Sequence, residues 1–263
     1  MATIRRRPRH DADAGGDEAL LVKKAALREE VWSALADAGV ARFPGAQGRI
    51  PNFVGAEAAA RRLASTDVWA SSERLKANPD APQWPVRQRA LEDGKLVYMA
   101  VPRLAGDRPF FVLDPRALTD SPRTASSIKG ASRSGHTVDL SGLSPVDLVV
   151  AGCVAVGEDG ARLGKGGGFS DLELAIAEAA GLVGAGTRLV TTVHELQVLP
   201  AGRIPTTRHD RWVDLVVTPD RLIVPERRPP AGAGINWEEL TDEKVAAIPL
   251  LRRLQARAGS LPG

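Results

Sequence analysis

The segment that most constrains this chain is a glycine-rich stretch between an apolar run and an amphipathic segment. Residues 146–156 are rich in valine and too few to cross a membrane, which predicts a buried strand. A polar turn follows at 158–160, and then comes RLGKGGGFSD at 162–171. Beyond it apolar residues recur at helical spacing, so we expect a helix that begins near Ser170 or Asp171. The predicted order is therefore strand, glycine-rich loop and helix.

A loop of this kind can hold a phosphate group. Glycines let backbone N–H groups approach an anion closely, and the helix N-terminus adds positive potential. Arg162 and Lys165 add positive charge. The loop is not a Walker A motif, because Lys165 is followed by Gly166, and it is not GxGxxG, because Phe169 stands three residues after Gly166. From composition alone, a phosphate site and a flexible connection are equally good interpretations.

The string Arg-Leu-Gly-x-Gly-x-Gly-aromatic-x-Asp resembles the signature of the 5-formyltetrahydrofolate cyclo-ligase family. The resemblance implies that the loop grips the phosphates of ATP, with Arg162 and Lys165 catalytic, and that Asp171 helps to hold Mg²⁺. The residues it assigns to ATP are Arg162, Gly164, Lys165, Gly166, Gly167, Gly168 and Phe169. Most relatives have two aromatic residues before the Asp, whereas here Ser170 follows Phe169. Part of the aromatic wall around the substrate is thus missing, and Phe169 and Ser170 are the substrate-binding residues implied there.

A second basic motif lies in the first predicted helix, which begins at Glu18 and ends at Gly39 as its C-cap. Lys24 and Arg28 are four residues apart and share one helical face. On spacing alone they are two solvated side chains. The pattern Lys-x-x-x-Arg also resembles the N-terminal helix of the same family, which implies that both cations reach the nucleotide phosphates.

The resemblance implies two further site residues. Glu57 stands near the start of an expected helix at 57–63, where a Glu of the family contacts the folate; the alternative is a solvated surface position. Asp214 ends the stretch HDRWVD at 209–214, which resembles a closing motif whose second Asp lies near the metal. The alternative for Asp214 is a carboxylate at a strand entry or helix N-cap.

Further strands are predicted at 96–101, 110–113 and 188–193, whereas 119–137 is rich in Ser, Arg and Gly and is predicted as a loop. Strands and helices alternate along the chain, which favours an α/β fold with a mostly parallel sheet covered on both faces. The resemblance implies the same architecture, a three-layer α/β/α fold with a mostly parallel central sheet.

The chain divides into three predicted parts. Residues 1–17 are polar and basic, which predicts a disordered arm; residues 18–226 form the cyclo-ligase-like α/β domain; residues 227–263 form a linker and a helical segment that packs on the core. The strings RFPG at 42–45, RIPNF at 49–53 and IPLLR at 248–252 look most like the branch of the family named for a methenyltetrahydrofolate synthase domain. Some members of that branch carry an RNA-recognition module, but no aromatic-rich strand of that type occurs here.

Composition excludes several other classes of protein. The net charge of +3, from 35 basic and 32 acidic residues, gives no strong field for nucleic acid. No apolar stretch approaches the about 18 residues of a membrane span. A single cysteine, Cys153, excludes an internal disulfide, and the four histidines are too dispersed for a His-rich zinc site. We expect a cytoplasmic protein, monomeric or homodimeric, without a membrane or nucleic-acid partner.

The reaction implied by the resemblance is the ATP- and Mg²⁺-dependent closure of 5-formyltetrahydrofolate, a reduced folate, to 5,10-methenyltetrahydrofolate, with release of ADP and phosphate. Two alternatives remain open from the sequence. One is a sister C–N ligase that acts on a non-folate formyl or acyl amide, which the departure at Ser170 and the position of Glu57 motivate. The other is a nucleotide- or folate-binding regulatory module without turnover.

Overall fold

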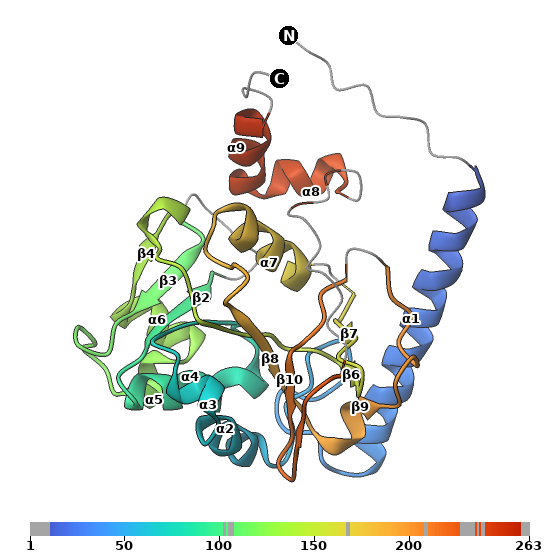
Figure 1. The fold of residues 1–263 in the computed structure, drawn as a ribbon, viewed down its shortest axis with the longest axis horizontal. Coiled ribbons are helices and arrows are strands. Elements are labelled where there is room, and N and C mark those ends of the chain that lie inside the picture. Colours follow the sequence, from blue (N-terminus) through green and yellow to red (C-terminus); the bar gives the residue numbers. More distant parts are fainter. Residues whose placement is uncertain are drawn as a thin grey trace.

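The computed structural model describes residues 11–101, 104, 108–166, 169–207, 210–226, 235, 237 and 240–258. Its centre is an eight-stranded sheet in the order β11-β10-β8-β5-β1-β2-β3-β4 (Figure 1). The strands β10, β8, β5, β1 and β2 run parallel, and the strands at both edges are antiparallel. The bounds are β1 Arg74–Ala77, β2 Leu96–Ala100, β3 Phe110–Leu113, β4 His136–Val138, β5 Leu148–Val150, β8 Arg188–Thr192, β10 Leu215–Val217 and β11 Leu222–Ile223. The mostly parallel sheet predicted from the sequence is confirmed.

One face of the sheet is covered by short helices: α2 Ala56–Ala64, α3 Asp67–Ala70, α4 Trp84–Glu92, α5 Pro122–Ala125 and α6 Ile128–Ser134. Leu63 of α2 and Val86 of α4 are fully buried in one apolar cluster with Leu75, Leu148 and Val190 of the sheet. Burial of these aliphatic side chains fixes the helices on the sheet, because each removes apolar area from water.

The other face is covered by α7, Phe169–Ala179, and by a second sheet of three strands in the order β7-β6-β9. These strands are β6 Ala155–Gly157, β7 Arg162–Leu163 and β9 Val198–Leu199. Leu174 of α7 and Val156 of β6 pack with Val149 and Leu189 of the large sheet. The long helix α1, Asp11–Asp37, lies against the small sheet (Figure 1). Its Leu35 is buried in one cluster with Ala155 of β6 and Leu163 of β7.

The C-terminal helices α8, Asp242–Ala247, and α9, Pro249–Ala258, lie beyond α7 (Figure 1). Ile248 and Leu251 are buried against Leu172 and Ile176 of α7. A helical C-terminal segment packed on the core was predicted, and its helices are found there. Among the described residues, no helix combines the length and the apolar character that crossing a membrane requires.

The valine-rich run 146–156 is not one strand, as predicted, but two strands in different sheets. β5 belongs to the large sheet, and β6 starts the small one after the connection Ala151–Val154. The backbone bonds change partner across this connection: Ala151 N donates to Val190 O, whereas Val154 N donates to Leu163 O. Periodicity could not reveal the change, because both strands and the connection are buried.

Two other expectations about local structure are wrong. Residues 119–137 form α5, α6 and the start of β4 rather than a loop, because Ser121 and Ser127 cap the two helices through their side chains. The helix expected from Glu18 begins instead at Asp11. Acidic residues in that first part of α1 favour a helix N-terminus. Residues 1–10 and 227–234 of the expected arm and linker lie outside the described residues.

Candidate active site

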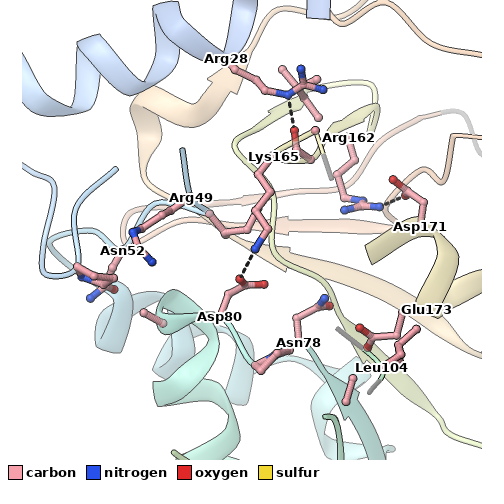
Figure 2. Close-up of a pocket in the computed structure, with 18 of the residues that line it drawn as sticks. Arg28, Arg49, Asn52, Asn78, Asp80, Leu104, Arg162, Lys165, Asp171 and Glu173 are labelled. Carbon is pink, nitrogen blue, oxygen red and sulfur yellow. Dashed lines mark hydrogen bonds and ion pairs between the residues drawn. The ribbon is translucent and has the colours of Figure 1, made fainter. Parts of the chain in front are cut away.

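A cavity of about 1060 Å³ opens where β1 and β2 end, at the carboxyl edge of the parallel strands. Ligands of open α/β sheets bind at this edge. The cavity is lined by residues from α1, from the connection 43–52, from the turn 78–81 after β1, from the glycine-rich loop and from the first turns of α7 (Figure 2). Segments far apart in the sequence therefore meet around one space.

The glycine-rich loop connects β7 to α7 and is held to α1 by Arg28. The Nε of Arg28 donates a hydrogen bond of 2.7 Å to the carbonyl oxygen of Gly164 (Figure 2). Gly166 has φ +99°, in the left-handed region, and a Cβ added there would lie 3.4 Å from Cζ of Arg28. The loop thus depends on glycine at this position for its backbone conformation, and a side chain there would contact the guanidinium of Arg28.

The other predicted cations of the site each have a carboxylate partner. Nζ of Lys24 lies 2.7 Å from Oδ2 of Asp210, and Nζ of Lys165 lies 3.6 Å from Oδ1 of Asp80. Lys24 is buried, whereas the side chain of Lys165 is 45% exposed. Both lysines line the cavity together with Arg28. The structure therefore brings together the two basic motifs that the sequence suggested.

Arg162 is anchored below the loop. Its side chain is 1% exposed, and it donates through Nη1 to Gly152 O at 3.1 Å and through Nη2 to Asp171. Asp171 stands in the first turn of α7, and its side chain is 40% exposed, so its carboxylate borders the cavity. Arg162 thereby fixes the carboxylate that the sequence suggested for the metal.

Two of the predicted site residues do not lie at the cavity. Asp214 precedes β10, where its Oδ2 accepts from Leu189 N at 2.7 Å. That position is at the amino ends of β8 and β10, opposite to the edge where the cavity opens. The predicted pairing of Asp171 and Asp214 on one metal ion is therefore wrong. Glu57 is exposed on α2, which covers the face of the sheet away from α7, so its predicted contact with the folate is also wrong.

The structure does not test four of the predicted site residues. Gly167 and Gly168 lie outside the described residues, and Phe169 and Ser170 form the start of α7 without described side chains. Their predicted roles toward ATP and the substrate stay predictions.

Sequence reasoning missed several residues that line the cavity. Asp80 and Arg87 come from the turn after β1 and from α4. Arg87 is 2% exposed, and desolvation by burial lowers its pKa to about 10. This pKa is still well above neutral pH, so the guanidinium stays protonated. Its guanidinium donates to the carbonyl oxygens of Asn78, Asp80 and Ser126, so it fixes the turn that carries Asp80. The short strand before this turn carries charge and gives no periodic signal, so nothing in the sequence marked these residues.

Another missed residue that lines the cavity is Glu173 of α7, whose carboxylate is paired with the buried Lys76 of β1. The connection after α1 adds Phe43, whose surface is 92% exposed although the residue borders the cavity, and Arg49. The cavity is therefore cationic along the loop and α1, with apolar and acidic groups elsewhere on its wall.

A magnesium ion fits this site only when phosphate oxygens supply part of its coordination, because the residues that the structure describes offer few ligands there. Within the described part of the chain, no group of three or more His, Cys, Asp or Glu side chains is placed to hold a metal ion. Mg²⁺ in nucleotide sites commonly takes one or two carboxylates and completes its octahedron with phosphate oxygens and water. Asp171, partly exposed beside the loop, fits the place of such a carboxylate.

Comparison with known proteins gives a consistent result. The model of the 5-formyltetrahydrofolate cyclo-ligase family matches residues 20–219. The methenyltetrahydrofolate synthase domain-containing protein of Mus musculus is 37% identical over 90% of this chain and 64% of its own length. The protein of the same name from Homo sapiens is 36% identical over 90% of this chain and 62% of its own length. The chain thus spans less than two thirds of the length of these relatives.

Among solved structures, the chain is similar to the NMR structure of 5,10-methenyltetrahydrofolate synthetase from Aquifex aeolicus. The identity is 19%, the TM-score is 0.49, and the match covers 78% of this chain and 94% of that one. The family model, which matches most of the chain, decides the assignment. The matched range includes the part of α1 that carries Lys24 and Arg28, the glycine-rich loop and α7. The chain belongs to the 5-formyltetrahydrofolate cyclo-ligase family.

Proposed function

We propose that this chain is an ATP- and Mg²⁺-dependent cyclo-ligase that converts 5-formyltetrahydrofolate to 5,10-methenyltetrahydrofolate and releases ADP and phosphate. The observation that carries the proposal is the contact of Arg28 with the glycine-rich loop, in a cavity that Lys24 and Lys165 also line. Three cations from two distant segments converge on one space. That arrangement suits a triphosphate better than an uncharged ligand.

The phosphates of ATP lie along the glycine-rich loop in this proposal. Backbone N–H groups of the loop and the N-terminus of α7 face the anion. Lys24 and Lys165 exchange Asp210 and Asp80 for phosphate oxygens, which keeps each ammonium group paired throughout. Arg162 stays in place, because its side chain is fully buried and bonded to Gly152 and Asp171.

The chemistry needs placement and charge neutralisation rather than a protein nucleophile. The formyl oxygen attacks the γ-phosphorus and ADP leaves. N10 of the folate then attacks the activated formyl carbon. The bond between that carbon and the phosphorylated oxygen breaks, phosphate leaves with the oxygen, and the N10 proton is lost. Lys165 and Arg28 offset the negative charge near the transferred group, and the cavity walls hold both reactants in line.

Mg²⁺ supplies charge neutralisation at the phosphate oxygens when it is bound. Asp171 is the protein ligand that we assign to it, and Arg162 holds this carboxylate in its orientation. Asp214 has no part in this assignment, because it lies at the other edge of the sheet.

The proposal is tested by incubating the protein with 5-formyltetrahydrofolate, ATP and Mg²⁺. The expected result is growth of the methenyl absorbance with one ADP formed per methenyl group, and loss of both on chelation of the metal. No methenyl product in the presence of demonstrable ATP binding would contradict it. ADP formation with a non-folate formyl amide but not with the folate would select the sister ligase, and ATP binding without ADP across a substrate panel would select the regulatory module.

A further inference from the structure

A buried ion pair joins Lys76 to Glu173, and Glu173 lies on the cavity wall; this pair is not needed for the phosphate site. The side chains are 4% and 6% exposed. The other ion-paired carboxylates of the cavity are more open, with 16% for Asp210, 20% for Asp80 and 40% for Asp171. Glu173 is thus the most deeply placed of these four carboxylates.

Its position follows from the periodicities of β1 and α7. Side chains alternate along a strand, so Leu75 and Ala77 enter the core under α2 and α4, and Lys76 points to the face that α7 covers. On α7, Leu172 packs with Ala100 and Leu104, and these two residues also line the cavity. The carboxylate of Glu173 therefore borders an apolar part of the cavity, away from the exposed Lys165 (Figure 2).

Stability alone does not account for this pair. The desolvation of two buried charges offsets most of their attraction, and a well-packed apolar pair of similar volume is often as stable or more stable. A charged group that is buried at the wall of a cleft is a typical feature of a ligand site.

We infer that Glu173 recognises the 2-amino-4-oxopyrimidine edge of the pterin ring, accepting hydrogen bonds from the ring N–H and the exocyclic amino group. The inference rests on the proposed function. A carboxylate offers two oxygens to two parallel donors, and these bonds are strong because the acceptor is charged. Lys76 balances the charge and orients the group. Ala100 and Leu104 supply apolar contact for the flat ring. This residue takes the role that Glu57, exposed on the far face, does not have.

The first test compares wild type with Glu173→Gln, which keeps the volume and an oxygen for Lys76 but turns an amide donor toward the ring. The dissociation constant of 5-formyltetrahydrofolate, measured by calorimetry, is expected to rise by about tenfold or more, since a charged hydrogen bond is lost. The KM for ATP is expected to stay unchanged. Glu178→Gln is the matched control, because Glu178 is also ion-paired on α7, to Arg211, but does not line the cavity.

A second test changes the ligand and compares its binding to wild type and to Glu173→Gln. Removing the 2-amino group from the pterin is expected to weaken binding to wild type by about the same factor, and to have little effect on Glu173→Gln. A structural role for Glu173 would leave the preference for the 2-amino group intact in the variant, and that result would overturn the inference. Absence of folate binding to wild type would overturn it as well. Binding of the folate without turnover would overturn only the proposed function.

Discussion

Arg28 of α1 donates a hydrogen bond of 2.7 Å to the carbonyl oxygen of Gly164, a residue 136 positions further along the chain. This bond joins the N-terminal helix to the loop between β7 and α7, and the cavity lies beside it. The first helix is therefore part of the proposed nucleotide site rather than an appendage to the fold.

Replacing Arg28 by alanine is expected to raise the KM for ATP by about tenfold or more, because a hydrogen bond to a charged group is worth about 1.5–3 kcal/mol. Initial rates at varied ATP measure the effect. Lys23→Ala is the matched control, since Lys23 is an exposed cation on the same helix and does not line the cavity. An equal loss in both variants would show that the charge of α1 as a whole matters, rather than the contact of Arg28.

Replacing Gly166 by alanine is expected to weaken ATP binding, because φ of +99° strains any L side chain and the new Cβ would stand 3.4 Å from Arg28. Gly202→Ala controls for strain alone: Gly202 has φ +77°, and nothing lies within 4 Å of its added Cβ. Both variants should lose stability by about 1 kcal/mol, the order of the cost of a left-handed L residue. Only Gly166→Ala should change the KM for ATP, and an unchanged KM there would contradict a phosphate site at this loop.

Replacing Arg87 by methionine is expected to destabilise the fold by about 3 kcal/mol or more, because buried carbonyl oxygens of Asn78, Asp80 and Ser126 lose a charged donor. Arg89→Met, on the same helix, removes a surface ion pair with Asp93 and should cost less than about 1 kcal/mol. Denaturant unfolding measures both. Similar stabilities of the two variants would show that the turn carrying Asp80 does not depend on Arg87.

The affinity for the folate is expected to fall on acidification, because only the ionised Glu173 accepts both hydrogen bonds. Desolvation raises the pKa of this carboxyl above 4.5, with Asp80 acting in the same direction and Lys76 and Arg162 opposing it. The loss of affinity should therefore begin above the pH range of an ordinary glutamate. Dissociation constants of the folate measured against pH should show this acidic loss of affinity in wild type but not in Glu173→Gln. The same pH dependence in the variant would show that another group causes it.

The parts of the site that the sequence predicted are those whose signal is local. The glycine-rich loop, the helix after it and the spacing of Lys24 and Arg28 are each readable within about a dozen residues, and the turn before the loop is the hairpin between β6 and β7. The meeting of the two basic motifs at one cavity came from the family resemblance rather than from either motif alone.

The parts that the sequence did not predict depend on contacts between distant residues. β1 has four residues and carries Lys76 at its centre, so neither length nor alternation marks it as a buried strand. The charge is tolerated only because Glu173 lies 97 residues further along the chain and meets it in the fold. The prediction for Asp214 was wrong for a different reason. Asp214 directly precedes β10, which runs parallel to β8, so its carboxylate lies at the amino ends of these strands and away from the cavity.

The central claim is that a triphosphate lies between the glycine-rich loop and α1. A structure of the wild-type protein with Mg²⁺ and a non-hydrolysable ATP analogue tests it most directly. The account predicts phosphate oxygens within hydrogen-bonding distance of Lys165 and of at least one of Lys24 and Arg28, with Asp171 near the metal. A nucleotide bound elsewhere, or one whose phosphates contact neither the loop nor α1, would contradict it.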